Sequence, residues 1–385
     1  MQRYDIILAG GGAAGLSLAC QLVHSPLCER SILIVDQDTK EQDDHTWCFW
    51  ADQPTLFDEI ISRSWDRLRV AGEGFTKTLD LGSYRYNMIR GSEFYRFARR
   101  VLSAHPNVEF VQGHVERIDD GNEDARVWVD GKAFDGSWVF DSLFRWSQLS
   151  HSVARYHALQ QQFKGWEIET PAAAFDPQVA TFLDFRTPQR HGLRFMYLLP
   201  LSDHQALLEY VLCAADSTSR EACEGALRAY LDGVLGLATY RIVRVEQGIS
   251  PLTDRPFPRR TGRHVMAIGI NGGMIKPSTG YAFMRIQQDS AAIVRSLVEH
   301  EHPYHVPRGP RRYRYFDAVM LDILERHGEW VAPILVALFR HNAAPRVLRF
   351  LDEAATPGEN LVMVPSLPPR LLLQSARTIG VLGRI

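Results

Sequence analysis

The sequence has few cysteines and no pattern that would use them together. Its five cysteines stand singly, without a C-x-x-C pair or metal-ligand spacing. This arrangement argues against a disulfide framework and a zinc site, so we expect no metal. Because isolated thiols suit a reducing compartment, and no signal peptide is recognisable before the first apolar strand, we expect a cytoplasmic protein.

Long runs of one residue class are also missing. The formal charge is −2 and there is no extended Lys/Arg run, so we expect no nucleic-acid partner. The strongest apolar run, residues 330–339, holds Pro333 and is too short to span a bilayer. Apolar residues recur at helical spacing over 319–339, which favours core packing over a helix lying on a membrane.

Three catalytic motifs are absent as well. The sequence has no G-x-S-x-G elbow, no P-loop lysine motif and no H-E-x-x-H. Hydrolase, phosphotransferase and metalloprotease chemistry are therefore disfavoured.

The N-terminal residues carry a dinucleotide-binding pattern instead. Gly10, Gly12 and Gly15 satisfy G-x-G-x-x-G between an apolar strand, residues 6–9, and a helix, residues 16–22. The first glycine permits a tight turn, the second admits a phosphate against bare backbone, and the third allows close packing of helix on strand. We expect a cofactor pyrophosphate at this helix N-terminus.

Further residues extend this predicted cofactor site. Ala13 and Ala14 begin the helix, and a second apolar strand ends at Asp36, whose carboxylate would accept hydrogen bonds from ribose hydroxyls. A second glycine turn follows a buried strand at residues 263–270, where close backbone approach to a ligand is expected. The other residues that we assign to the cofactor site are Trp47, Arg90, Gly269, Gly272, Gly273, Lys276, Thr279 and Gly280.

The rest of the chain has a two-part pattern. Residues 41–50 mix turn formers with aromatics and predict a loop beside the cofactor or an apolar pocket. A strand at 84–90 and a helix capped by Ser92 follow. Runs at 180–185, 194–199 and 205–211 then indicate an antiparallel sheet, and residues 307–354 read as helical.

Glu209 is the leading candidate for an acid. It stands among apolar and aromatic residues in 206–211, where desolvation would raise its pKa and keep a proton available near neutral pH. The alternation of that strand is equally consistent with Glu209 on a solvent face. Asp184 and Glu246 are similar cases with weaker support, and His45 and His204 rank below Glu209 as proton donors.

Blocks of sequence spread over nearly the whole chain resemble the flavin-dependent lycopene cyclases, of the bacterial lycopene β-cyclase type. The blocks occur in the family's order at residues 45–50, 163–170, 183–186, 197–202, 206–210, 246–248, 276–281 and 350–353. Together they are far more specific than the glycine pattern.

The resemblance implies an α/β fold of the p-hydroxybenzoate-hydroxylase and geranylgeranyl-reductase kind. We predict a Rossmann-like FAD-binding domain over 1–160 and 246–300, an antiparallel substrate-binding sheet over 161–245, and a helical C-terminal region over 301–385.

The resemblance also implies cyclisation of the ψ ends of lycopene to β-ionone rings, with Glu209 as the acid, reduced FAD as cofactor and NAD(P)H as its reductant. Because the substrate is apolar, a peripheral position on a membrane lipid surface is expected. Aromatic faces would stabilise the cation; the candidates are Phe49, Trp50, Tyr197, Tyr210 and Tyr281. Two alternatives stay open: an FAD-dependent isoprenoid reductase or hydroxylase, and a non-catalytic carotenoid-binding flavoprotein.

Overall fold

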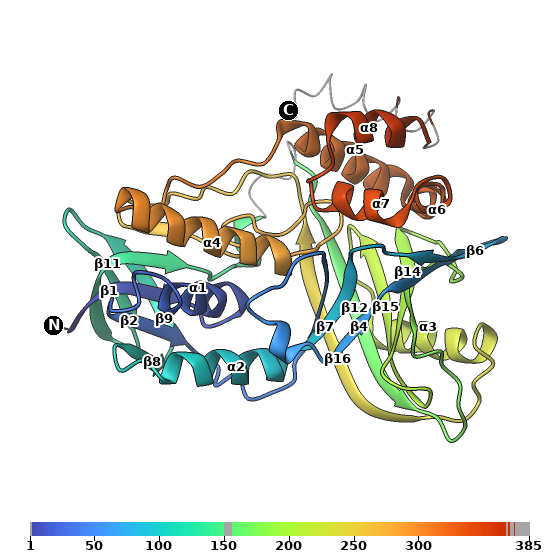
Figure 1. Cartoon of the computed structure of the whole chain (residues 1–385), viewed down its shortest axis with the longest axis horizontal. Helices are drawn as coiled ribbons and strands as arrows, with labels where there is room; N and C mark the ends of the chain where they lie inside the picture. Colours follow the sequence, from blue (N-terminus) through green and yellow to red (C-terminus); the bar gives the residue numbers. More distant parts are fainter. Residues whose placement is uncertain (1, 150–155, 367–368, 370–372, 374–385) are drawn as a thin grey trace.

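Two large β-sheets occupy the two halves of the molecule, and helices cover each of them (Figure 1). The computed structural model describes residues 2–149, 156–366, 369 and 373. The N-terminus begins the first sheet, and the C-terminal helices lie over the second (Figure 1).

The first sheet has the strand order β8-β2-β1-β11-β10-β9, with β17 beside β11. Strands β8, β2, β1, β11 and β17 run parallel, and β10 and β9 are antiparallel additions. The strands span Val108–Gln112 (β8), Ile32–Asp36 (β2), Gln2–Ala9 (β1), Lys132–Asp141 (β11), Ala125–Val129 (β10), Val115–Asp120 (β9) and Val265–Ala267 (β17).

Apolar residues on both faces explain why this sheet is buried. Residues 6–9 of β1 are apolar and buried, as a parallel strand covered on both sides requires. Helices α1 (Ala13–Val23), α2 (Gly91–Ser103) and α4 (Phe283–His300) pack on one face. The hairpins of β9, β10 and β11 contribute the core on the other face.

The second sheet has seven strands in the order β16-β12-β15-β14-β13-β5-β6. All neighbours are antiparallel except β13 and β5, which run parallel. The strands span Arg241–Leu252 (β16), Leu159–Glu169 (β12), Gln205–Ala214 (β15), Leu193–Pro200 (β14), Val179–Asp184 (β13), Arg67–Gly72 (β5) and Phe75–Asp80 (β6). A small sheet of β3 (Thr46–Ala51), β7 (Arg85–Arg90) and β4 (Arg63–Trp65) lies between the two halves.

The two faces of the second sheet have different partners. Helix α3 (Arg220–Gly233) packs on one face. Helices α5 (Arg311–His327), α6 (Val331–His341) and α7 (Ala344–Leu351) pack on the other, and α8 (Pro357–Met363) follows them. Short 3-10 turns occupy Asp58–Ile60, Trp146–Gln148, Gly328–Trp330 and Val364–Ser366. The apolar stripe of 319–339 lies in this core, as its spacing predicted.

Three predictions about elements were wrong. The segment 41–50 is not all loop, because β3 starts at Thr46 and pairs with β7. Ser92 does not cap α2; it lies inside the first turn, where its N–H donates to Asp43 Oδ1 at 3.2 Å. The predicted domain limits also fail, because β5 and β6 from segment 1–160 hydrogen-bond to the second sheet, and β16 continues through the limit at 245/246.

A buried ion pair attaches the C-terminal helices to the rest of the protein. Lys276 Nζ lies 2.9 Å from Asp317 Oδ1 on α5 and 3.1 Å from Glu353 Oε1, just beyond α7. Removing one partner from such a pair leaves an uncompensated charge, which typically costs about 3–5 kcal/mol.

We therefore predict that Asp317→Asn lowers the free energy of unfolding by about 3 kcal/mol, at the lower end of that range because Glu353 still pairs with Lys276. Urea denaturation measures the loss. The exposed Asp66→Asn is the control, and equal stability of the two variants would contradict this role of Lys276.

Candidate active site

The glycine turn after β1 has the geometry that the sequence pattern predicts. Gly10 has φ +109°, and a Cβ there would lie 2.1 Å from Ser142 Oγ. A Cβ on Gly15 would lie 2.0 Å from the Gly10 carbonyl oxygen, so helix α1 can pack this closely only with glycine. In contrast, a Cβ on Gly12 would have no neighbouring atom within 4 Å. The turn therefore leaves room at the N-terminus of α1, where Ala13 and Ala14 begin the helix.

Asp36 closes one side of this space. Its Oδ2 accepts a hydrogen bond from the Gly11 N–H at 2.6 Å, which holds the carboxylate beside the glycine turn. A cavity of about 180 Å³ lies at this point, lined among others by Gly11, Asp36, Lys40 and Arg99. An acid at the end of β2 beside such a cavity suits the ribose hydroxyls of a dinucleotide.

The second glycine turn packs against the first. Gly269 has φ +59°, and a Cβ there would lie 2.7 Å from Ala14 Cβ. The N–H groups of Gly272, Gly273 and Gly280 donate to carbonyl oxygens inside the loop itself. These glycines therefore shape the turn, and the close approach of their backbone to a cofactor stays a prediction.

Two of the predicted cofactor residues carry buried polar atoms without a partner. Trp47 Nε1 and Thr279 Oγ1 have no hydrogen bond within the described part of the chain. Buried donors are normally satisfied, so both positions fit contact with a bound group. Lys276, a third predicted residue, instead uses its ammonium in the ion pair with Asp317 and Glu353.

Arg90 belongs to a charge network between the two halves. It donates two hydrogen bonds to Glu167 of β12, at 2.9 and 3.0 Å, and one to Asp43 at 3.3 Å. Arg244 of β16 also binds Glu167, at 3.1 Å, and reaches Glu246 at 2.7 Å. Burial alone would raise the pKa of Glu167, but the hydrogen bonds from both arginines outweigh it and lower that pKa. The carboxylate of Glu167 is thus held ionised.

An apolar cavity of about 290 Å³ lies between the second sheet and helices α5 and α6. Its lining is dominated by aromatic and aliphatic side chains from both layers, among them Phe182, Tyr197, Tyr281, Ile334 and Phe339. The hydroxyls of Tyr197 and Tyr281 are hydrogen-bonded to one another at 2.9 Å. Such a space suits an apolar ligand.

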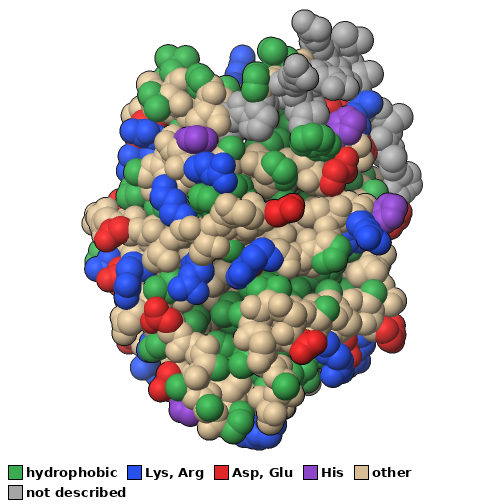
Figure 2. All heavy atoms as spheres, turned by 90° about the vertical axis from the view of Figure 1, so that its right-hand side faces the viewer, with side chains coloured by type: hydrophobic (Ala, Val, Ile, Leu, Met, Phe, Trp, Pro, Cys, Tyr) green, Lys and Arg blue, Asp and Glu red, His purple; other side chains and the backbone are tan. Residues whose placement is uncertain are grey.

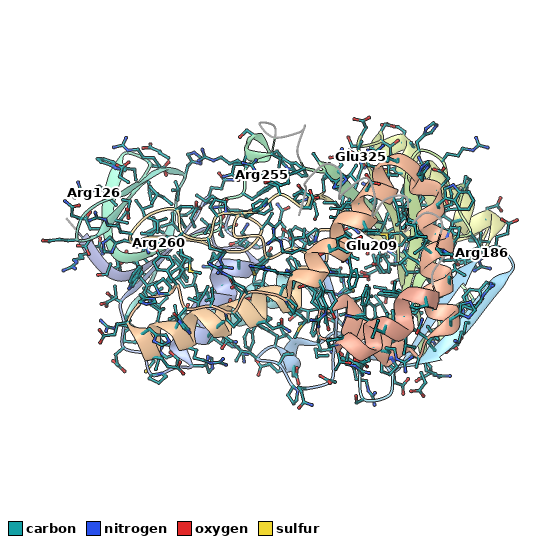
Figure 3. The ribbon with its side chains drawn as sticks, turned by 90° about the horizontal axis from the view of Figure 1, so that it is seen from above. Arg126, Arg186, Glu209, Arg255, Arg260 and Glu325 are labelled. Atoms are coloured by element: carbon teal, nitrogen blue, oxygen red, sulfur yellow. The ribbon has the colours of Figure 1, made fainter. Side chains whose placement is uncertain are left out.

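Glu209 lies on the cavity side of the second sheet. On β15, Leu207, Val211 and Cys213 share its face and belong to the core under the C-terminal helices, whereas the intervening residues face α3. Its direct partner on β14 is Tyr197, which lines the cavity. Figure 3 shows Glu209 in this half of the molecule, among the sheet and the C-terminal helices. The solvent-face alternative is therefore excluded.

Burial and a second carboxyl act together on Glu209. Burial, followed by the charge of Glu246 and a hydrogen-bonding contact with it, raises the pKa of Glu209 well above its usual range. Burial also raises the pKa values of Cys48 and Tyr197, and the charge of Glu209 adds to both. The carboxyl of Glu209 therefore holds its proton more tightly than an ordinary glutamate does.

Other candidate acids do not share this environment. Asp184 accepts hydrogen bonds from Arg186 and Tyr230, which outweigh its burial and lower its pKa, so it is not a proton donor. His204 lies on the β14–β15 hairpin, with Nδ1 3.0 Å from the Thr170 carbonyl oxygen. His45 pairs with Asp44 at 2.9 Å, beside Trp47.

The aromatic candidates divide between three places. Trp50, Tyr197 and Tyr281 belong to the cavity side of the second sheet. Phe49 packs on Phe283 in the core of the first half, with ring centroids 4.7 Å apart. Tyr210 lies on the α3 face and accepts a hydrogen bond from Arg194. Phe49 and Tyr210 therefore do not line the apolar cavity, and we withdraw them as candidates for cation stabilisation.

Comparison with known proteins shows the family of the chain. The family model described as lycopene cyclase protein matches residues 5–377. The chain belongs to the lycopene cyclase family.

Relatives within the family are distant in sequence. A lycopene beta-cyclase of Pantoea ananas is 24% identical over 73% of this chain and 71% of its own length. A chloroplastic lycopene beta cyclase of Arabidopsis thaliana is 25% identical over 78% of this chain. The chain spans 61% of the length of that plant relative.

Solved structures show which fold this chain has. A geranylgeranyl bacteriochlorophyll reductase-like protein of Thermoplasma acidophilum superposes with a TM-score of 0.64, at 12% identity, covering 99% of this chain and all of that one. A flavin-dependent brominase gives 0.63, at 14% identity, with all of both chains covered. The predicted α/β fold of the geranylgeranyl-reductase kind is confirmed.

Several residues of this candidate site were not predicted from sequence. Gly165 lies between Glu209 and Glu246 in the sheet, and Thr46 and Arg244 hold Glu246. Asp352 accepts a hydrogen bond from Trp50 Nε1 at 2.5 Å. A signal was available in the position of Thr46, Gly165 and Asp352 inside the family blocks; Arg244 becomes visible only through strand register.

The buried carboxyl of Asp352 makes the free energy of unfolding depend on pH. Burial raises its pKa to about 7, although the hydrogen bond from Trp50 opposes the rise. Between about pH 4 and pH 7 the folded protein then holds a proton that the unfolded chain has released, so this group destabilises the fold as pH rises.

We predict that the free energy of unfolding of the wild type, minus that of Asp352→Asn, falls by up to about 1 kcal/mol per pH unit between pH 4.5 and pH 7. Urea denaturation of both proteins across this range measures it. A difference that stays constant with pH would show that Asp352 titrates normally.

Proposed function

We propose that this protein is a lycopene cyclase that uses reduced FAD and closes the ψ ends of lycopene into β-ionone rings, without net oxidation or reduction. The observation that carries the proposal is the position of Glu209: an acid with a raised pKa, on the same sheet face as a large apolar cavity. Such an acid can protonate an apolar polyene where water is scarce.

The residues around the first glycine turn fit FAD. The N-terminus of α1 with Gly10, Gly12 and Gly15 would hold the pyrophosphate, and Asp36 would bind the adenosine ribose. Trp47 Nε1 and Thr279 Oγ1 have no hydrogen-bond partner among the described residues, so both could form hydrogen bonds with the remaining part of FAD. Bound in its reduced, anionic form, FAD supplies negative charge that favours a nearby cation; we propose NAD(P)H as its reductant.

The chemistry that Glu209 would perform is a proton transfer. Its carboxyl O–H breaks as a C–H bond forms at the terminal double bond of the polyene, and the next double bond attacks the resulting carbocation. Loss of a proton from the ring then restores neutrality, so the product has the mass of the substrate. Nothing in these steps consumes electrons.

Aromatic rings would stabilise the cation without trapping it. Trp50, Phe182 and Tyr281 form a cluster in which Trp50 meets Tyr281 edge to face, with ring centroids 4.8 Å apart, and Phe182 stacks on Tyr281 at 6.3 Å. Each ring face contributes about 1–2 kcal/mol to a desolvated cation.

The cavity would receive its substrate from a lipid surface. Val364 and Leu373 line it and are themselves exposed, and Leu361 and Val362 of α8 are 76% and 56% exposed beside them. Acidic and basic side chains are otherwise interspersed over this end of the molecule (Figure 2). Among the described residues, no helix combines the length and apolarity that crossing a bilayer would need. We therefore propose peripheral binding to lipid through α8.

Anaerobic incubation of the protein with lycopene in lipid, FAD and NAD(P)H tests the proposal. Chromatography should show monocyclic and bicyclic products of unchanged mass. Added hydrogens would indicate a reductase, added oxygen a hydroxylase, and unchanged lycopene a binding protein.

We predict that Gly12→Val folds but loses at least nine-tenths of its FAD, because the side chain enters the space left for the pyrophosphate. Absorbance of released FAD measures the content, and thermal unfolding checks the fold. Gly225→Val is the matched control, since Gly225 also has open space around it but lies on α3. Full FAD content in Gly12→Val would place the cofactor elsewhere.

We predict that Glu209→Gln lowers the cyclisation rate about 100-fold or more while FAD stays bound, because an amide cannot donate the proton. The exposed Glu169→Gln on the neighbouring strand should keep wild-type activity. A fully active Glu209→Gln would remove Glu209 from the reaction.

A further inference from the structure

Two glutamates flank one glycine in a row that crosses three neighbouring strands of the second sheet. Glu209 of β15 pairs with Gly165 of β12, and Gly165 pairs with Glu246 of β16. Residues in one such row point to the same face of a sheet. A Cβ on Gly165 would lie 3.0 Å from Glu209 Cγ and 2.8 Å from Glu246 Cγ. The absent side chain is therefore what allows the two carboxyl groups to meet above the middle strand.

The two oxygens of Glu246 have different surroundings. Oε2 accepts hydrogen bonds from Thr46 Oγ1 at 2.8 Å and from Arg244 Nη1 at 2.7 Å. Oε1 is buried and accepts no hydrogen bond from the described residues. The carboxyl of Glu209 approaches Glu246 across Gly165. A hydrogen bond between them requires a proton on one of the two.

The charges around the pair decide how many protons it holds. Two arginines, Arg90 and Arg244, face three carboxylates, namely Asp43, Glu167 and Glu246. The other groups against Glu209 are Cys48 and Tyr197, whose raised pKa values keep them neutral. With one negative charge already in excess, ionising Glu209 as well would place two like charges in contact.

We propose that Glu209 and Glu246 share a single proton, with Glu246 as the ionised member fixed by Arg244 and Thr46 and Glu209 as the member that gives the proton to substrate. This inference rests on the proposed cyclisation. Glu246 is a positioning residue that keeps Glu209 protonated at neutral pH.

The pair also accounts for the return of the proton. Once Glu209 has protonated the polyene, its carboxylate lies against the carboxylate of Glu246, and this repulsion strengthens Glu209 as a base. The ring cation then loses a C–H proton to Glu209 Oε, and the shared state is restored. Proton and electrons balance over the cycle without any other reactant.

Infrared difference spectroscopy in H₂O and D₂O tests the pair without turnover. In the FAD-loaded wild type, one protonated-carboxyl band should be present at neutral pH and missing from Glu209→Gln, whereas the band of Asp352 is common to both proteins. In Glu246→Gln the alkaline midpoint of this band should move down by about 1–3 pH units, because the like charge is gone. The alkaline limb of kcat should move with it, while KM for lycopene is retained.

Two further variants complete the test. Gly165→Ala keeps both carboxyls but puts a methyl between them, and should shift the same midpoint downward; it also serves if Glu246→Gln does not fold. Glu169→Gln should leave band and rate unchanged. Equal midpoints in wild type, Glu246→Gln and Gly165→Ala would overturn the shared proton. A shifted band in a protein that leaves lycopene unchanged would support the pair and reject the cyclase.

Discussion

The site depends on a set of ion pairs buried where the two halves of the molecule meet. Arg90 from β7 and Arg244 from β16 both bind Glu167 of β12, and Arg244 continues to Glu246. Breaking such pairs leaves a desolvated charge without a partner, so the network fixes the register between the small sheet and the large one. Among the described residues no ion pair is recorded for the neighbouring Glu209, which in our proposal keeps its proton beside the ionised Glu246.

One face of the second sheet combines an apolar cavity with an acid. The period-2 alternation of β15 directs Leu207, Glu209 and Val211 to the same side, under the C-terminal helices. A carboxyl in that position would ordinarily be destabilising. The adjacent Gly165 leaves room for a second carboxyl, that of Glu246, and in our proposal the two share a proton where other buried acids pair with an arginine. This difference separates Glu209 from Asp184, which is paired with Arg186 and ionised.

Local patterns predicted much of the fold and the first glycine turn. The strand, glycine turn and helix at 6–22 depend on contacts close in sequence, and the structure matches them. Strand pairing between distant segments was not predictable in the same way. The association of β5 and β6 with the second sheet, and the row of Glu209, Gly165 and Glu246, arise from register between segments far apart in the chain. For the same reason Glu209 and Glu246 were both named as candidate acids, whereas their pairing was not predicted.

The measurement that tests the central claim most directly is the isotopic content of the product formed in D₂O. If Glu209 starts each ring closure and exchanges its proton with D₂O between one closure and the next, every ring formed from lycopene by the FAD-loaded protein should contain one deuterium, and Glu209→Gln should form almost no such product. Rings without deuterium, or products carrying two added hydrogens, would contradict a proton-initiated cyclisation.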